Sequence, residues 1–201
     1  MKLYYSPGAC SLSPHIVALE AGIPMQIEKV DLRAKKTESG ADFWAVNPKG
    51  YVPALDLGNG QVLTEGPAIV QYLADQKPES NLAPRNGTME RYRLQEALNF
   101  ITAELHKSIG SLFNPAQQGE WKDFTLGMID KRLGALDKQL EGKQYLLGDF
   151  SVADAYLYTV LNWTRMHKID LSKFANVSAY LERVGARPKV QEAMKAEGLI
   201  K

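Results

Sequence analysis

Apolar and polar residues change their spacing near the middle of the chain. The first part contains short runs of strand-forming residues at 2–5, 25–30, 52–57 and 61–63. Helical spacing follows the first run as far as Gly22, recurs at 43–46 and returns at 67–74. The predicted order is strand, helix, strand, short helix, two strands and helix, which makes an α+β unit.

The connections predict how these strands pair. A helix joins the first two strands, so we expect them to be parallel with a right-handed crossover. Gly58-Asn59-Gly60 separates the last two strands and is a strong hairpin signal, so we expect that pair to be antiparallel.

Strand signals end after a linker at 77–87, which contains two prolines, two asparagines and a glycine. Apolar residues then recur every three or four positions over 89–113, which predicts one long amphipathic helix. Further helices are predicted at 124–140, 152–166, 177–184 and 190–196. We therefore expect two domains, an α+β domain at 1–77 and an all-helical domain at 88–201.

Composition narrows the class of protein. The 201 residues are 45% hydrophobic, with 24 basic and 23 acidic side chains, as in a soluble globular protein. A balanced charge argues against a nucleic-acid binder or a binder of anionic membranes. No apolar run approaches the roughly 18 residues of a membrane span, and Pro7 and Gly8 interrupt any signal-peptide pattern. We predict a cytoplasmic protein.

The chain has one cysteine, Cys10, which excludes an internal disulfide and a multi-cysteine metal site. It follows the first strand and a turn, at the start of the predicted helix. Unpaired N–H groups and the helix dipole favour an anion there, which would lower the pKa of the thiol. Ser13 takes the place of the second cysteine in a C-x-x-C motif, so a mixed disulfide at Cys10 would need an external thiol to resolve it. The alternative is an inert cysteine that fills a packed corner.

Two further segments of the α+β part carry candidate binding groups. Val52-Pro53 begins a strand, where a cis bond would leave the Val52 backbone open to an extended ligand; a plain strand-start proline is the alternative. Glu65-Gly66 lies where the last strand meets a helix. The Gly66 N–H suits a carboxylate and Glu65 suits an ammonium group, although Glu65 equally suits the helix dipole alone.

In the helical part, Asn99, Ala103 and His106 are spaced to share one face of the long helix beside its apolar stripe. Such a polar ridge is typical of the wall of a cleft, where His106 could donate a hydrogen bond to a thiolate. The alternative is that His106 is merely exposed to solvent and has no role. Ser151 and Asp154 match a helix capping box, a structural feature.

These residues together resemble a bacterial beta-class glutathione S-transferase over essentially the whole chain. The matching stretches are Ser6-Pro7-Gly8-Ala9-Cys10-Ser11, Val46-Asn47-Pro48-Lys49-Gly50-Tyr51-Val52-Pro53-Ala54-Leu55, Leu63-Thr64-Glu65-Gly66, Glu104-Leu105-His106-Lys107 and Ser151-Val152-Ala153-Asp154. The resemblance implies a thioredoxin-like N-terminal domain that binds glutathione. It also implies an all-helical domain with the electrophile site and dimer contacts, and a homodimer.

The resemblance assigns roles to particular positions. Cys10 would lie at the glutathione sulfur, with His106 as its partner. The remaining glutathione contacts would be Lys35 to the glycyl carboxylate, the Val52 backbone to the cysteinyl part, Glu65 and Gly66 to the γ-glutamyl end, and Asn99, Ala103 and Glu104 from the long helix. Pro53 would be structural. Many relatives have serine at the position of Gly66, so only a backbone N–H contact is expected there. Tyr5 and Ser11 remain alternatives to Cys10 for activating the thiol.

The expected function is a glutathione transferase with glutathione as co-substrate, no tightly bound cofactor and no metal. Its electrophile would be hydrophobic, aromatic or halogenated, and Cys10 would add thiol-disulfide or reductive chemistry through a mixed disulfide with glutathione. The alternative is a non-catalytic protein of the same fold that binds hydrophobic ligands or a protein partner. Residues that could set specificity, or could equally be core, are Phe113, Trp121, Tyr156, Trp163, Thr164 and His167.

Overall fold

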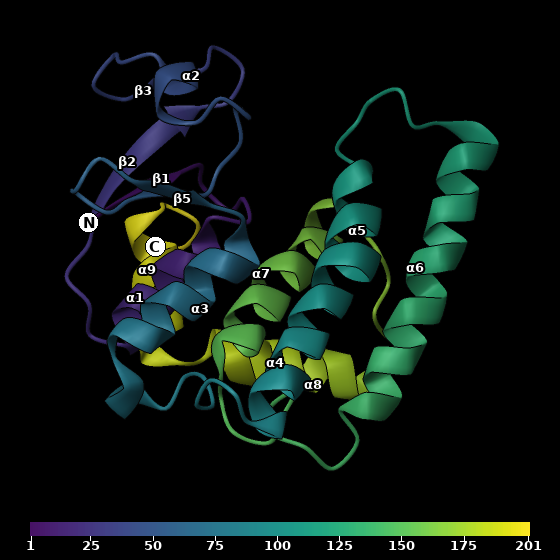
Figure 1. Cartoon of the computed structure of the whole chain (residues 1–201). Helices are drawn as coiled ribbons and strands as arrows, with labels where there is room; N and C mark the ends of the chain where they lie inside the picture. The colour runs from purple at the N-terminus through teal and green to yellow at the C-terminus, as the bar shows by residue number, and fades with distance from the viewer. The chain divides into compact units, whose positions relative to one another are not determined.

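The computed structural model describes all 201 residues, which form two compact units (Figure 1). The first unit comprises Met1–Ala83 together with Arg187–Lys201, and the second comprises Pro84–Ala186. The first unit is α+β and the second contains only helices apart from isolated bridges, which confirms the predicted fold class.

A five-stranded sheet forms the centre of the first unit, in the order β3-β2-β1-β4-β5. The strands are β1 (Lys2–Tyr5), β2 (Gln26–Asp31), β3 (Lys36–Thr37), β4 (Ala54–Asp56) and β5 (Val62–Thr64). Strands β1 and β2 are parallel and β4 and β5 are antiparallel, as the connections predicted. Strand β3 was not predicted, because two residues are too few to show a period. The arrangement is the thioredoxin-like one.

The helices of the first unit are α1 (Leu12–Glu20), α2 (Phe43–Val46), α3 (Gly66–Gln76), the 3₁₀ turn η1 (Pro78–Ser80) and α9 (Pro188–Ala196). Helix α1 packs against both α3 and α9, and the three lie together beside the sheet in Figure 1. Ile16 and Val17 of α1 are completely buried in this layer. Burial of apolar side chains between sheet and helices thus holds the loop before α1 on a rigid support.

The C-terminal segment belongs to the first unit, whereas the expected boundaries of 1–77 and 88–201 grouped it with the other helices. Arg187 forms an ion pair with Glu20 of α1, with both N···O distances 2.8 Å. A bidentate pair between partly buried groups fixes both position and orientation. Glu20 and Arg187 are 167 positions apart in sequence, so no local pattern could indicate this contact.

The second unit consists of α4 (Met89–Phe100), the π-helix η2 (Ile101–His106), α5 (Lys107–Ser111), α6 (Gly119–Gln139), α7 (Val152–Met166) and α8 (Ala175–Gly185). The predicted helix over 89–113 is therefore one continuous helical stretch with a π segment inside it. Helix α7 contacts α4, η2, α5 and α8 and is buried along most of its length. None of the helices combines the length and the apolar character needed to cross a lipid bilayer.

The predicted capping box is present at the start of α7. The Ser151 hydroxyl accepts a hydrogen bond from the Ala153 amide, and the Asp154 carboxylate accepts one from the Ser151 amide at 2.9 Å. Asp154 is completely buried and also accepts hydrogen bonds from the Leu146 amide and the Tyr180 hydroxyl. Burial raises the pKa of the Asp154 carboxyl, although these hydrogen bonds oppose the shift.

Candidate functional site

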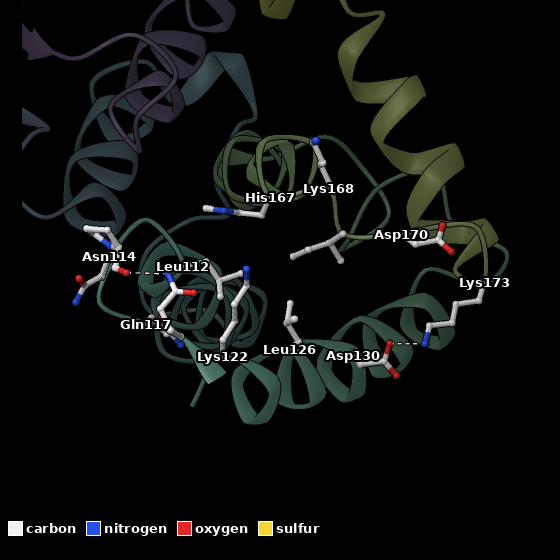
Figure 2. Close-up of a pocket in the computed structure, with 13 residues that line it drawn as sticks. Leu112, Asn114, Gln117, Lys122, Leu126, Asp130, His167, Lys168, Asp170 and Lys173 are labelled. Atoms are coloured by element: carbon white, nitrogen blue, oxygen red, sulfur yellow. Dashed lines mark hydrogen bonds and ion pairs between the residues drawn. The ribbon is translucent and has the colours of Figure 1, made fainter. Parts of the chain in front are cut away.

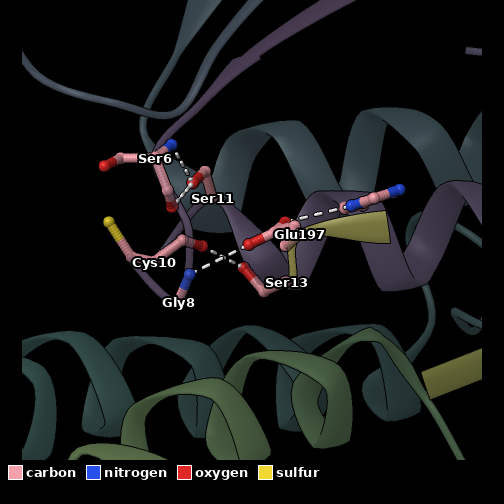
Figure 3. Close-up of polar contacts among 7 residues, drawn as sticks. Ser6, Gly8, Cys10, Ser11, Ser13 and Glu197 are labelled. Atoms are coloured by element: carbon pink, nitrogen blue, oxygen red, sulfur yellow. Dashed lines mark hydrogen bonds and ion pairs between the residues drawn. The ribbon is translucent and has the colours of Figure 1, made fainter. Parts of the chain in front are cut away.

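The loop between β1 and α1 presents Cys10 one residue before the N-cap of α1, Ser11 (Figure 3). The side chain is half-buried and forms no disulfide. Its thiol donates a hydrogen bond to the Val52 carbonyl oxygen, with 3.2 Å between sulfur and oxygen. The structure therefore brings together two of the predicted site residues, Cys10 after the end of β1 and Val52 before the start of β4.

The two serines after Cys10 bond to the backbone. The buried Ser11 hydroxyl accepts a hydrogen bond from the Ser6 amide at 3.1 Å and donates one to the Ser6 carbonyl at 3.2 Å. The Ser11 side chain makes no capping hydrogen bond to α1. Ser13 donates to the Cys10 carbonyl at 2.8 Å. Ser11 thus closes the loop, which leaves it poorly suited to activate a thiol.

A buried carboxylate supports the same loop from the C-terminal segment. Glu197 accepts a hydrogen bond from the Gly8 amide at 3.0 Å, and its other oxygen lies 3.0 Å from Nδ1 of His15 (Figure 3). Glu197 and His15 are 182 positions apart, so no local sequence pattern indicates this contact. Because both Glu197 oxygens have partners, the carboxylate fixes the loop two residues before Cys10.

Tyr5, the other alternative for thiol activation, is buried at the end of β1. Burial, followed by the charges of Glu197 and Glu38, raises the pKa of its hydroxyl. A phenolate is therefore disfavoured at this position, and Cys10 remains the better candidate for an anion.

Lys35 lies in an aromatic cradle formed by residues of the first unit. Its ammonium group is 5.4 Å from the ring centre of Trp44 and 5.6 Å from that of Tyr51, and it donates to the Gly50 carbonyl at 2.7 Å. The rings stabilise the cation through cation–π attraction and limit where it can reach. Gly50 has a φ of +67°, and a Cβ there would lie 2.5 Å from the Trp44 ring, so this close approach requires glycine.

The other candidate binding residues of this unit lie on either side of β4 and β5. The Val52-Pro53 peptide bond is cis, the first of the two alternatives considered from the sequence. Glu65, the N-cap of α3, has a φ of 71°, a conformation that costs energy for a non-glycine residue and is concentrated at functional sites. Its exposed carboxylate pairs with Lys49 at 2.8 Å, a partner that no sequence pattern indicated.

The candidate site residues on the long helix of the second unit are not arranged as the polar ridge that the sequence predicted. Asn99 and Ala103 are exposed and His106 is half-buried. The prediction assumed α-helical spacing throughout, but Ile101–His106 has π-helical hydrogen bonding, which changes the angle between successive side chains. Glu104 forms an ion pair with Arg132 of α6. Its carboxylate therefore has a protein partner before any ligand is considered.

His106 belongs to a row of aromatic side chains inside the second unit. Its Nδ1 lies 2.5 Å from the Tyr156 hydroxyl, and its ring centre is 4.9 Å from that of Trp163. The ring centre of Phe113 is 5.7 Å from that of Trp163 and 4.3 Å from that of His167. Several residues considered for specificity are thus in mutual contact. Thr164, by contrast, is fully buried, and Trp121 is half exposed.

A separate pocket of about 470 Å³ lies within the second unit, between the end of α5, α6 and the segment after α7 (Figure 2). Leu112, Lys122 and His167 are among the residues that line it. Burial, then the charge of Lys122, lowers the pKa of His167. Two lining atoms, Nε2 of His167 and Oε1 of Gln117, are buried without a hydrogen-bond partner.

No group of three or more His, Cys, Asp or Glu side chains in the structure could hold a metal ion.

Comparison with known proteins covers both units. A family model described as the glutathione S-transferase N-terminal domain matches residues 8–76, and one described as the C-terminal domain matches residues 100–188. Glutathione S-transferase GstA of Escherichia coli O157:H7 is 44% identical over 200 residues, covering 99% of this chain and 100% of that protein.

Solved structures give the same result. A sphingomonad glutathione S-transferase complexed with glutathione is 48% identical, with a TM-score of 0.95 and 100% of both chains covered. The bacterial beta-class glutathione S-transferase of Sphingomonas chungbukensis is 50% identical, with a TM-score of 0.96 and the same coverage.

Proposed function

The chain belongs to the beta class of the glutathione S-transferase family, and from this premise we propose that its chemistry centres on the Cys10 thiol. The protein is a glutathione S-transferase, an enzyme with glutathione as co-substrate. The proposal adds that Cys10 lies at the glutathione sulfur and that the electrophile is hydrophobic, aromatic or halogenated. It also adds that Cys10 exchanges disulfides with glutathione.

The position of Cys10 carries the proposal. The thiol lies just before a helix N-terminus, where N–H groups and the helix dipole stabilise an anion. Its loop is held by Ser11 and Glu197, so the sulfur is presented from a fixed backbone. A protein that only bound hydrophobic ligands would not need a thiol at this position.

The charged groups around the first unit suit the two ends of glutathione. We assign the glycyl carboxylate to Lys35, whose ammonium group has further donors besides the one to Gly50. We assign the γ-glutamyl end to Glu65, whose carboxylate suits the ammonium group, and to the Gly66 N–H at the start of α3. The backbone of Val52 would pair with the cysteinyl part. Pro53 keeps the structural role proposed for it.

The disulfide chemistry can be written as two exchanges. The Cys10 thiolate attacks the glutathionyl sulfur of a mixed disulfide, a new S–S bond forms, and the other thiol leaves as its anion and takes up a proton. A glutathione thiolate then attacks the Cys10–glutathione disulfide, releasing Cys10 and glutathione disulfide. The second step needs glutathione because Ser13, not a second cysteine, follows in the resolving position.

The helical unit contributes the remaining part of the proposal. His106 would assist the thiolate as a hydrogen-bond donor, and Asn99, Ala103 and Glu104 would line the glutathione site. A homodimer and a cytoplasmic location also belong to this proposal, supported by membership of the family. Light scattering coupled to size-exclusion chromatography tests the dimer, since a monomer at micromolar concentration would contradict it.

Intact mass spectrometry tests the role of Cys10 directly. Protein treated with glutathione disulfide should gain one glutathione per chain, and Cys10→Ala should gain none while still binding S-methylglutathione. A glutathione adduct that persists in Cys10→Ala would overturn the assignment. In parallel, turnover is measured with aryl halides and with mixed disulfides. Micromolar ligand binding without turnover of either substrate class would instead favour the non-catalytic alternative.

A further inference from the structure

Tyr156, on helix α7, makes a close polar contact with His106. Its hydroxyl oxygen lies 2.5 Å from Nδ1 of His106, and its side chain is only 1% exposed. From the sequence, Tyr156 could be either a specificity residue or part of the core. A buried phenol at this distance from an imidazole nitrogen can fix which of the two ring nitrogens carries the proton.

Thr102 indicates where the protons lie. Its hydroxyl donates to the Leu98 carbonyl at 2.8 Å, and its oxygen lies 3.4 Å from the Tyr156 hydroxyl. The one hydroxyl proton of Thr102 is thus used on the shorter contact. A phenol O–H is a strong donor and an unprotonated imidazole nitrogen a strong acceptor, so the shortest contact suits donation from Tyr156 to Nδ1.

The His106 ring is also held by its neighbours. The Trp163 ring lies edge-on to it, with centres 4.9 Å apart and planes at 73°. A Cβ added at Gly110 would lie 3.5 Å from both the His106 and the Trp163 rings, so the helix backbone closes the same space. Packing and hydrogen bonding therefore restrict the same ring, which is what a group with one required orientation needs.

We propose that Tyr156 is a positioning residue that donates its hydroxyl proton to Nδ1 of His106 and so holds the neutral imidazole as the Nε2–H tautomer. In this state His106 can donate from Nε2 to a sulfur anion. The inference rests on the proposed function for its catalytic consequence, but the tautomer itself is a property of the ligand-free protein. The two can therefore be tested separately.

Nitrogen-15 NMR of histidine-labelled protein tests the tautomer. The chain has three histidines, so the His106 signals can be assigned by their loss in His106→Gln. We expect an unprotonated, hydrogen-bonded Nδ1 in the wild type, and a shift of that signal towards the unbonded value in Tyr156→Phe. Tyr158→Phe is the matched control, because it removes another buried hydroxyl from the same helix. A wild-type Nδ1–H signal, or a Tyr156→Phe spectrum identical to the wild type, overturns the proposal.

Kinetics then test the consequence for catalysis. Tyr156→Phe should lower kcat for conjugation roughly tenfold, with KM for glutathione unchanged within about twofold, and Tyr158→Phe should leave kcat near the wild-type value. Equal losses of kcat in both variants would show a general structural effect and overturn the positioning role. If the Nδ1 signal moves but kcat does not, the hydrogen bond is supported and the catalytic role of His106 in the proposed function fails.

Discussion

Replacing Glu197 with alanine tests whether a residue near the C-terminus holds the loop that carries Cys10. The Glu197 side chain is completely buried; one of its oxygens accepts a hydrogen bond from the Gly8 amide, and the other lies 3.0 Å from Nδ1 of His15. The substitution removes this partner from the half-buried Gly8 amide and from the buried His15 ring. Loss of a hydrogen-bond partner in a buried or partly buried place costs about 1–3 kcal/mol, and two such contacts are lost here, so the substitution should cost about 3 kcal/mol. We therefore expect Glu197→Ala to loosen the loop without unfolding the second unit.

Hydrogen exchange at the Gly8 amide measures this effect locally. This readout is preferable to a single melting curve, because a chain with two units need not unfold in one step. A loss of about 3 kcal/mol corresponds to faster exchange by roughly 150-fold if Gly8 exchanges through local opening. Cys10 should also be alkylated faster, since its loop opens more often. Glu192→Ala is the control, because Glu192 lies on α9, the helix that ends at Glu197, but is exposed and pairs only with Lys189.

The result that would refute this reasoning is equal Gly8 exchange in Glu197→Ala, Glu192→Ala and the wild type. The carboxylate would then not hold the loop, however well its oxygens are placed. Glu197→Gln refines the test, since it keeps one acceptor oxygen and should produce an intermediate exchange rate.

Three other substitutions test local features of the fold. Hydrogen bonds from Lys2, then Ser39, lower the pKa of Glu28 to about 2. A carboxyl whose pKa is lower in the folded than in the unfolded protein stabilises the fold at pH values above its unfolded pKa. Glu28→Gln should therefore lower the free energy of unfolding by roughly 2 kcal/mol at neutral pH, measured by urea unfolding. This difference from the wild type should disappear as the pH falls from about 4 to 2. Gly50→Ala should cost roughly 2 kcal/mol by the same assay, since its Cβ meets the Trp44 ring at 2.5 Å; a wild-type midpoint would contradict that strain. Ser151→Ala should cost about 1 kcal/mol through the lost cap of α7, and unchanged thermal stability would show that the capping box is dispensable.

Features encoded by neighbouring residues were predictable from the sequence. Gly58-Asn59-Gly60 indicated the β4–β5 hairpin, and Ser151 with Asp154 indicated the start of α7. Each depends on residues a few positions apart, which are close in space in any conformation of the chain. The position of Cys10 just before α1 was predictable for the same reason.

The contacts that complete the candidate sites join distant parts of the chain. Glu197 meets His15, Lys49 meets Glu65, and Tyr156 meets His106, with separations of 182, 16 and 50 positions. No periodic pattern marks such partners, because their proximity results from tertiary packing. The π segment at Ile101–His106 escaped prediction for a different reason: its apolar spacing is compatible with an ordinary α-helix.

The contact between Glu197 and the loop before Cys10 has a consequence for synthesis on the ribosome. The chain is made from its N-terminus at about 5–20 residues per second, so Glu197 follows His15 by roughly 10–40 s. During that interval α1 lacks the C-terminal helix that packs on it. Pro84–Ala186, by contrast, is contiguous in sequence and needs no segment that is made after it. The part of the nascent chain that bears the thiol emerges first and is completed last.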